Sequence, residues 1–347
     1  MQATLTIDLD VIAGNWRRLD AMSGSRVQTS AVVKADAYGL GMARVAPALF
    51  QAGARIFFVA QAEEGVALRA ILGEGAEIFN LSGYLPGDDA ALERFSVAPV
   101  LNSAMQVQSF ARKHKGQPCA VQFDTGMNRQ GLEAAEAIRV TPDIIGLKPA
   151  MLLSHLACGD DPKHGLNDAQ RQVFMAMTAA MPNIKRSIAA TDGIMLGTPF
   201  HFDVTRPGIG LYGGLSLENS NPIVSLELPV LQIRDVRPGE TVGYGGDWRA
   251  ARPSKIATVL GGYADGILRA SKNLTLYSNN TPCPVIGRKS MDMLGVDVTD
   301  IEDVPVTLSL LNRLQTVDDL AARAGTINYE ILTGLGARYK RVYKGGK

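Results

Sequence analysis

The stretch VQTSAVVKADAYGLGMARVAPALFQAGARIFFVAQ, residues 27–61, joins two apolar runs through an amphipathic segment. The runs at 27–34 and 55–61 have the length and the β-branched or apolar content of strands, and the segment between them has the spacing of a helix. A strand, a helix and a second strand in succession predict a βα unit of a parallel sheet. Lys34 stands at the end of the first run.

Similar runs recur to about residue 213, and helical patterns separate most of them. Eight such runs favour a closed (β/α)8 barrel over an open doubly wound sheet. The predicted strands are VQTSAVVK (27–34), RIFFVAQ (55–61), EIFNLSG (77–83), VAPVLN (97–102), CAVQFD (119–124), PAMLLSHL (149–156), KRSIAAT (185–191) and FDVTRPGIG (202–210).

Beyond Pro222 the pattern changes to strand-like pieces joined by proline and glycine turns, followed by two short helical segments. Such a pattern is typical of a mainly antiparallel β domain. The chain is therefore predicted to be an α/β protein of three parts. These are an N-terminal strand within residues 1–10 that pairs with the C-terminal domain, a (β/α)8 barrel over 11–221, and a C-terminal β domain over 222–347.

Charge and composition point to a small-molecule ligand. The 347 residues include 35 basic and 34 acidic side chains, so neither a nucleic acid nor a membrane surface is expected as a partner. The opening MQATLTIDLD has the features of neither a signal nor a transit peptide, and we expect a cytoplasmic protein. The three cysteines, Cys119, Cys158 and Cys283, are far apart in the sequence. Their spacing and odd number favour reduced thiols over a disulfide framework or a CxxC zinc site.

Lys34 falls at the carboxyl end of the first barrel strand, where enzymes of this fold build their active sites. Partial burial lowers the pKa of a lysine, which makes its amine a nucleophile toward an aldehyde or a general base. The alternative is a strand-end lysine that extends its charge into water. Polar residues at other strand ends favour the functional interpretation, because they converge on the same barrel mouth: Asp124, Arg129, His155, Thr191 and Arg206.

The segment GIGLYG, residues 208–213, matches the dinucleotide fingerprint G-x-G-x-x-G, but no βαβ unit surrounds it and no nucleotide site is predicted. The backbone N–H groups of Gly208 and Ile209, with the Thr191 hydroxyl, instead suit a phosphate monoester. A lysine nucleophile and a phosphate cradle in one mouth indicate a phosphorylated aldehyde held as an imine. Pyridoxal phosphate is the common one.

Six motifs carry a family resemblance over essentially the whole chain. AVVKADAYGLG (31–41), DTGMNRQG (124–131), RPGIGLYG (206–213), VGYGGDW (242–248), GYADG (262–266) and GRKSMD (287–292) resemble the successive motifs of the alanine racemases, pyridoxal-phosphate enzymes of fold type III. The resemblance implies a two-base interconversion of L- and D-alanine. Its product would supply peptidoglycan synthesis, or the reaction would serve alanine catabolism.

The resemblance also implies residue roles. Lys34 binds the cofactor and acts as the base on the D-side, while Tyr244 acts on the L-side, because one group rarely reaches both faces of a planar centre. His155 partners this tyrosine, and Arg206 lies behind it against the pyridine nitrogen. The implied cofactor-binding residues are Lys34, Tyr38, His155, Thr191, Arg206, Gly208 and Ile209.

The resemblance further implies a head-to-tail homodimer, because Tyr244 belongs to the β domain and reaches the barrel mouth of the other subunit. Arg129 would pair with the substrate carboxylate or with the phenolic oxygen of the cofactor. The implied substrate contacts are thus Arg129 and Met291, and the supporting or entrance residues are Gln122, Tyr263, Asp265 and Asp292.

Three positions depart from the family pattern. Gln122 stands where many members carry a carbamylated lysine that orients Arg129, and its amide oxygen can accept a hydrogen bond from Arg129 only more weakly. Where some members have an asparagine and a serine after the seventh barrel strand, this chain has Ala190 and Thr191, so one polar residue is missing. Ala337 takes the place of a phosphate-binding tyrosine, and Tyr339 is two residues off that register.

The nearest alternative is a racemase of broad specificity or of basic amino acids, because one sequence does not show the width of the entrance. A non-enzymatic pyridoxal-phosphate-binding protein would share the barrel and the lysine but lack the β domain that supplies Tyr244. A fold-related decarboxylase would use a cysteine opposite the lysine. No metal site is expected, since the spacing of His155, Cys158, Asp160 and His164 fits no standard zinc pattern.

Overall fold

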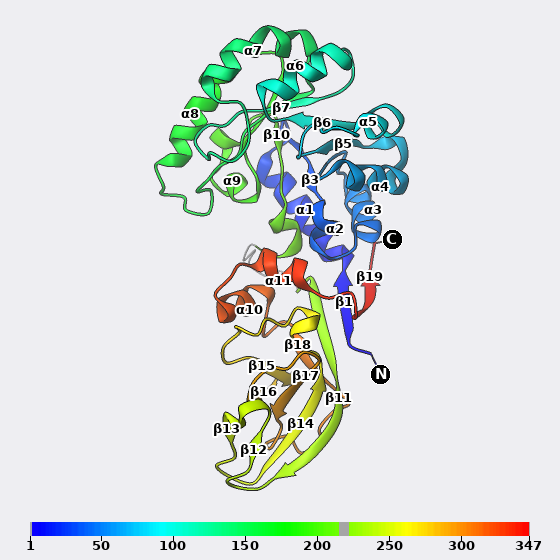
Figure 1. Ribbon diagram of the computed structural model, residues 1–347, viewed down its shortest axis with the longest axis vertical. Coiled ribbons are helices and arrows are strands. Elements are labelled where there is room, and N and C mark those ends of the chain that lie inside the picture. Colours follow the sequence, from blue (N-terminus) through cyan, green and yellow to red (C-terminus); the bar gives the residue numbers. More distant parts are fainter. Residues whose placement is uncertain (1, 215–221, 347) are drawn as a thin grey trace. The chain divides into compact units, whose positions relative to one another are not determined.

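The computed structural model describes residues 2–214 and 222–346. The chain divides into two compact units, Ile12–Tyr212 and Met1–Val11 with Gly213–Lys347 (Figure 1). The first is a barrel and the second a mainly antiparallel sheet, so the predicted fold class is confirmed. The predicted boundary at residue 221 lies outside the described residues.

The barrel unit contains a parallel sheet in which each strand pairs with the next along the chain. Its strands are buried because the barrel core lies on one side and helices lie on the other. In order around the sheet they are β3 (Ala31–Val32), β4 (Ile56–Val59), β5 (Glu77–Asn80), β6 (Val97–Leu101), β7 (Ala120–Gln122), β8 (Met151–Leu153) and β9 (Lys185–Ser187).

An eighth strand closes the ring. β10 (Val204–Thr205) pairs in parallel with β2 (Gln28–Thr29), which precedes β3 in the same run of sequence. On its other side, the N–H of Arg206 donates to the carbonyl of Ala189 at 2.8 Å. The eight predicted strands are therefore present, with the first one divided into β2 and β3.

Helices surround the strands of the barrel unit (Figure 1). No helix within the described ranges is both long and apolar enough to cross a membrane. The helical elements are α1 (Leu9–Ser23), α2 (Lys34–Tyr38), α3 (Met42–Ala52), α4 (Ala62–Leu72), η1 (Gly73–Gly75), α5 (Asp89–Phe95), α6 (Ala104–Lys113), α7 (Ala134–Leu147), α8 (Leu166–Thr178), α9 (Thr191–Met195), η2 (Thr198–Phe200) and η3 (Ile209–Tyr212).

The second unit is built on one sheet of order β14-β17-β16-β15-β18-β11-β1-β19, and β14 also pairs with β11. Strand β1 (Thr4–Asp8) runs antiparallel to β11 (Val224–Val236) and parallel to β19 (Lys340–Lys344). The remaining elements are β12 (Thr241–Val242), η4 (Tyr244–Gly246), β13 (Trp248–Arg249), β14 (Ser254–Leu260), η5 (Tyr263–Asp265), β15 (Thr275–Ser278), β16 (Thr281–Ile286), β17 (Met293–Asp297), β18 (Thr307–Leu311), α10 (Val317–Ala324) and α11 (Asn328–Gly334).

Candidate active site

Lys34 opens a left-handed turn at the carboxyl end of β3. Four residues after it, Ala35 to Tyr38, have φ angles between 53° and 57° although none is glycine. Each costs about 1–2 kcal/mol relative to a right-handed conformation. Backbone bonds across the turn, including Gly39 N to Ala35 O at 2.8 Å, hold it in place. Strain of this kind gathers at functional sites, where the surroundings must enforce it.

Glu64, the third residue of α4, enforces this turn through its carboxylate. Its Oε1 accepts the N–H of Ala35 at 2.7 Å, and its Oε2 accepts those of Ala60 at 2.7 Å and Gln61 at 3.3 Å. The carboxylate therefore ties the residue after Lys34 to the carboxyl end of β4. Sequence reasoning missed Glu64, because Glu63 and Glu64 are adjacent glutamates and nothing in the local sequence distinguishes one from the other.

Substitution of Glu64 tests this role. Glu64→Ala should lower the free energy of unfolding by about 2 kcal/mol or more, since hydrogen bonds to a charged group are lost and a strained backbone N–H loses its acceptor. Glu63 is exposed, and Glu63→Ala should change the free energy of unfolding by less than about 0.5 kcal/mol. Denaturant unfolding of both variants measures the difference. An equal effect of the two substitutions would contradict the role of Glu64.

The amine of Lys34 is partly buried, and its pKa lies below the ordinary lysine value. Burial is the largest cause, the positive charge of Arg129 adds to it, and the negative charge of Glu64 opposes both. A lowered pKa increases the fraction of neutral amine, which is the nucleophilic and basic form.

Arg206 is buried behind the mouth, and its guanidinium donates to the hydroxyl of Ser187 and to the carbonyl of Ser154. No carboxylate forms an ion pair with it among the described residues. Burial lowers the pKa of Arg206 to about 10, so the group stays charged at neutral pH. The guanidinium of Arg206 is a charged donor held by neutral acceptors. It can donate a hydrogen bond to an unprotonated ring nitrogen.

His155 follows β8, and its backbone carbonyl accepts from the amide of Gln170 at 2.9 Å. Burial, and then the positive charges of Arg206, Arg129 and Lys34, lower the pKa of His155 to about 3. A lowered pKa favours the neutral form, so the imidazole is uncharged throughout the physiological range.

Thr191 gathers the backbone donors of the last barrel loop. Its Oγ1 accepts the N–H of Gly208 at 3.0 Å and that of Gly210 at 3.2 Å. A Cβ at position 208 would lie 2.4 Å from the Tyr38 hydroxyl, which is therefore adjacent to the same loop. The structure therefore brings three predicted phosphate contacts together, Tyr38, Thr191 and Gly208, and the predicted Ile209 lies in the same loop.

The loop after β7 places Arg129 near the lysine. Asp124 Oδ1 accepts three successive N–H groups, from Gly126, Met127 and Asn128, at 2.8–3.1 Å. Gln122 is buried, and its amide donates to the Gln130 carbonyl at 3.1 Å. Gln122 thus anchors the backbone beside Arg129.

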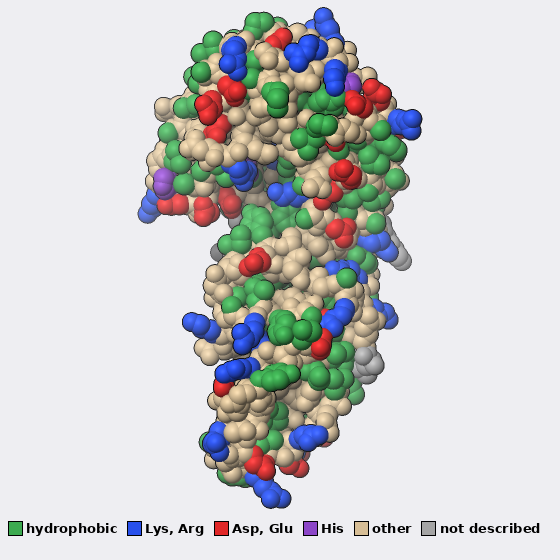
Figure 2. Space-filling view, in the orientation of Figure 1, with side chains coloured by type: hydrophobic (Ala, Val, Ile, Leu, Met, Phe, Trp, Pro, Cys, Tyr) green, Lys and Arg blue, Asp and Glu red, His purple; other side chains and the backbone are tan. Residues whose placement is uncertain are grey.

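The other predicted site residues lie on the antiparallel unit. One surface depression there is lined by Tyr244, Tyr263, Met291 and Asp292, together with basic side chains of neighbouring loops. Tyr244 is 70% exposed and Met291 52%. Figure 2 shows hydrophobic and basic side chains next to one another over this unit. The structure therefore groups these four residues on a solvent-facing surface of their own unit.

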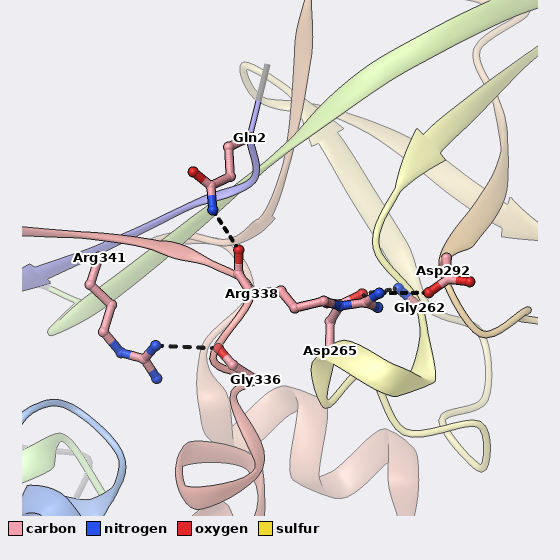
Figure 3. A network of polar contacts seen from close by, with 7 residues as sticks. All are labelled: Gln2, Gly262, Asp265, Asp292, Gly336, Arg338 and Arg341. Atoms are coloured by element: carbon pink, nitrogen blue, oxygen red, sulfur yellow. Dashed lines mark hydrogen bonds and ion pairs between the residues drawn. The ribbon is translucent and has the colours of Figure 1, made fainter.

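Asp265 is buried in the same unit and is paired with a residue that the sequence did not single out. Arg338 binds it through Nε–Oδ1 at 2.7 Å and Nη2–Oδ2 at 2.8 Å, and it binds Asp292 through Nη1–Oδ1 at 2.7 Å (Figure 3). The neighbouring Tyr339 is buried, and burial and the charge of Asp265 raise its pKa.

The mouth of the barrel fits a phosphorylated ring aldehyde. A lysine amine of lowered pKa matches its aldehyde, and backbone donors beside Thr191 match its phosphate. The buried guanidinium of Arg206, which no carboxylate in the described part of the chain pairs with, matches its ring nitrogen. The arrangement can bind such a group covalently and move a proton at an atom attached to it.

Comparisons with known proteins bear on the same chain. The family model of the alanine racemase N-terminal domain matches residues 7–216, and that of the C-terminal domain matches 223–343. An alanine racemase of Cereibacter sphaeroides is 53% identical over 98% of each chain, and one of Rhizobium meliloti is 41% identical over 99% of this chain and 97% of its own. A crystal structure of alanine racemase from Bartonella henselae with covalently bound pyridoxal phosphate has a TM-score of 0.93 at 38% identity, and covers 99% of this chain and 100% of its own.

Proposed function

The chain belongs to the alanine racemase family and is a pyridoxal-phosphate-dependent isomerase of L- and D-alanine, and we propose that it works through two bases, Lys34 and Tyr244. The observation that carries this proposal is the lowered pKa of Lys34 at the carboxyl end of β3, within a mouth that also offers a phosphate cradle.

The residues of the barrel mouth fit the cofactor. Lys34 would hold it covalently, Tyr38, Thr191 and the N–H groups of the Gly208–Gly210 loop would bind its phosphate, and Arg206 would donate to its ring nitrogen. When bound, the cofactor supplies an electron sink for the charge that forms at Cα of alanine. Because Arg206 donates a hydrogen bond but no proton, the sink is weaker than one paired with a carboxylic acid, which favours simple return of the proton.

Racemisation removes the Cα proton from one face and returns it to the other, and each face needs its own group. Lys34 serves the D-side of alanine, where its lowered pKa keeps neutral amine available. Tyr244 serves the L-side. Its phenol requires help to ionise, and the neutral His155 with Arg206 behind it would stabilise the phenolate by hydrogen bonding and charge.

The remaining residues orient the substrate. Arg129 would bind the carboxylate of alanine, and Gln122 keeps the backbone beside it in place. Met291 would contact the substrate from the antiparallel unit, with Asp292 next to it. Tyr263 would line the entrance, and the buried Asp265 would support it.

The proposal includes a head-to-tail homodimer in which Tyr244 and Met291 complete the partner's mouth. Supporting it, Tyr244 and Met291 line one exposed depression. Other large apolar side chains of the same unit are exposed too, as at a protein–protein interface: Leu231, Ile233, Met293, Val306 and Ile327.

Tyr244→Phe should affect the two enantiomers differently. In deuterated water, exchange at Cα of L-alanine should fall by about 10²-fold or more, because its base is lost. Exchange at Cα of D-alanine should fall by less than about tenfold, since Lys34 is intact. Tyr277→Phe, in strand β15, is the matched control and should leave both rates within about twofold. Equal loss for both enantiomers would show that Tyr244 is not face-specific.

An assay of substrate range tests the proposed function directly. Incubation with L-alanine, L-serine, L-lysine and L-arginine, followed by chiral chromatography, should show racemisation of alanine fastest. A faster reaction with a basic amino acid would favour the alternative racemase.

A cytoplasmic location and the supply of D-alanine for peptidoglycan, or alanine catabolism, complete the proposal. The three cysteines are free, as in a reducing compartment.

A further inference from the structure

Three segments of the antiparallel unit meet at Asp265. The N–H groups of Tyr263 and Ala264 donate to the carbonyls of Ser290 and Met291, at 3.1 and 3.0 Å. From the third segment, the N–H of residue 336 donates to the carbonyl of Asp265 at 3.1 Å. The loops that carry Tyr263 and Met291 are therefore joined backbone to backbone.

These backbones are packed too closely for side chains between them. A Cβ at Gly262 would lie 2.3 Å from the carbonyl oxygen of Met291, and one at Gly266 would lie 2.0 Å from that of Gly334. Gly266 also has a φ of +89°, which only glycine adopts readily. A displacement of one loop is consequently passed to the others.

Arg338 is the charged link across this junction (Figure 3). The side chain of Asp265 is 7% exposed, and besides binding the Nε and Nη2 edge of the guanidinium it accepts the N–H of Gly262 at 3.0 Å. The third contact of Arg338 is with Asp292, beside Met291. A planar guanidinium can bind two carboxylates at once in fixed directions, which a lysine cannot do.

We propose that Arg338 is a positioning residue of the racemase reaction. It touches no reacting atom. It holds the loop of Tyr263 and the loop of Met291 in one arrangement, and so fixes the side chains that limit the size of substrate admitted. This inference rests on the proposed function, in which those two side chains face the partner subunit's site.

Arg338→Ala should raise the KM for L-alanine by about tenfold or more with a change in kcat of less than about threefold, since loosened loops misplace the substrate before the chemical step. The preference for L-alanine over L-serine, as a ratio of kcat/KM values, should fall as well. Arg338→Lys should recover only part of both effects. Arg252→Ala is the control. Arg252 pairs with Asp300 at 2.7 Å and is 55% exposed, which is close to the 52% exposure of Arg338. Loss of the Arg252 side chain should leave kcat and KM within about twofold.

Hydrogen exchange gives a readout independent of activity. In Arg338→Ala, the amides of Tyr263 and Ala264 should exchange faster while the sheet strands keep their protection, and in Arg252→Ala neither should change. If Arg338→Ala fails to fold, Asp292→Asn takes its place, because it weakens only the more exposed ion pair of Arg338. It should shift KM and amide exchange in the same direction as expected for Arg338→Ala. Unchanged KM and unchanged exchange, or faster exchange throughout the unit, would overturn the inference. Failure of the wild-type protein to racemise alanine would instead overturn the proposed function.

Discussion

Replacing Lys34 with alanine is expected to lower the rate of alanine racemisation by about 10⁴-fold or more. The substitution removes both the covalent hold on the cofactor and one of the two bases, and a positioned general base alone contributes about 10² to 10⁴ in rate. Chiral chromatography of L- and D-alanine mixtures measures the loss. In the unaltered protein, borohydride reduction followed by peptide mapping should place the cofactor on Lys34.

Lys185 provides the matched control. It lies at the amino end of strand β9, on the opposite side of the barrel from the mouth, where its amine donates to Gln28 Oε1 at 2.7 Å. Lys185→Ala should leave the rate within about twofold. A borohydride label on a lysine other than Lys34, or a Lys34→Ala protein that keeps its activity, would remove the basis of the proposed mechanism.

Mixing two inactive variants is expected to restore activity. In a dimer with shared sites, Lys34→Ala and Tyr244→Ala damage different sites, so a heterodimer of the two has one mouth with both bases intact. Statistical exchange makes about half of the dimers mixed, each with one good site of two, and the ceiling is therefore about a quarter of wild-type activity. Recovery should fall on dilution below the dimer dissociation constant.

Mass spectrometry of the mixture supplies the control, because it measures how much heterodimer has formed. The Lys34→Ala protein alone, taken through the same exchange procedure, should stay inactive at every concentration. Heterodimers that form in the expected amount without any recovery of activity would place Lys34 and Tyr244 in the site of the same subunit.

Much of the barrel could be predicted because its signals are local. The run at 55–61 contains strand β4 at 56–59, and residues 185–191 contain β9 at 185–187. Most barrel strands lie within a short apolar run next to a helical pattern, and from β3 to β9 neighbours in sequence are neighbours in the sheet. The polar residues at the strand ends were found for the same reason, since the fold places all carboxyl ends at one mouth.

Contacts between distant residues could not be predicted in this way. Arg338 binds Asp265, 73 positions earlier, and Glu64 binds the backbone of Ala35, 29 positions earlier. Neither pair leaves a periodic pattern. The left-handed turn after Lys34 was also missed, because Ala35 and Ala37 have no preference for it and one aspartate between them does not predict a run of such residues. The surrounding structure imposes the turn.

The position of β1 in its sheet has a consequence for synthesis of the protein. β1 ends at Asp8, yet its partners begin at Val224 and Lys340. A ribosome adds about 5–20 residues per second, so β1 waits roughly tens of seconds for its neighbours. Strands β3 to β9 of the barrel unit, by contrast, pair in the order in which they emerge. The barrel strands β3 to β9 can therefore pair before β1 finds its partners, and during that interval the hydrogen-bonding edges of β1 are unpaired.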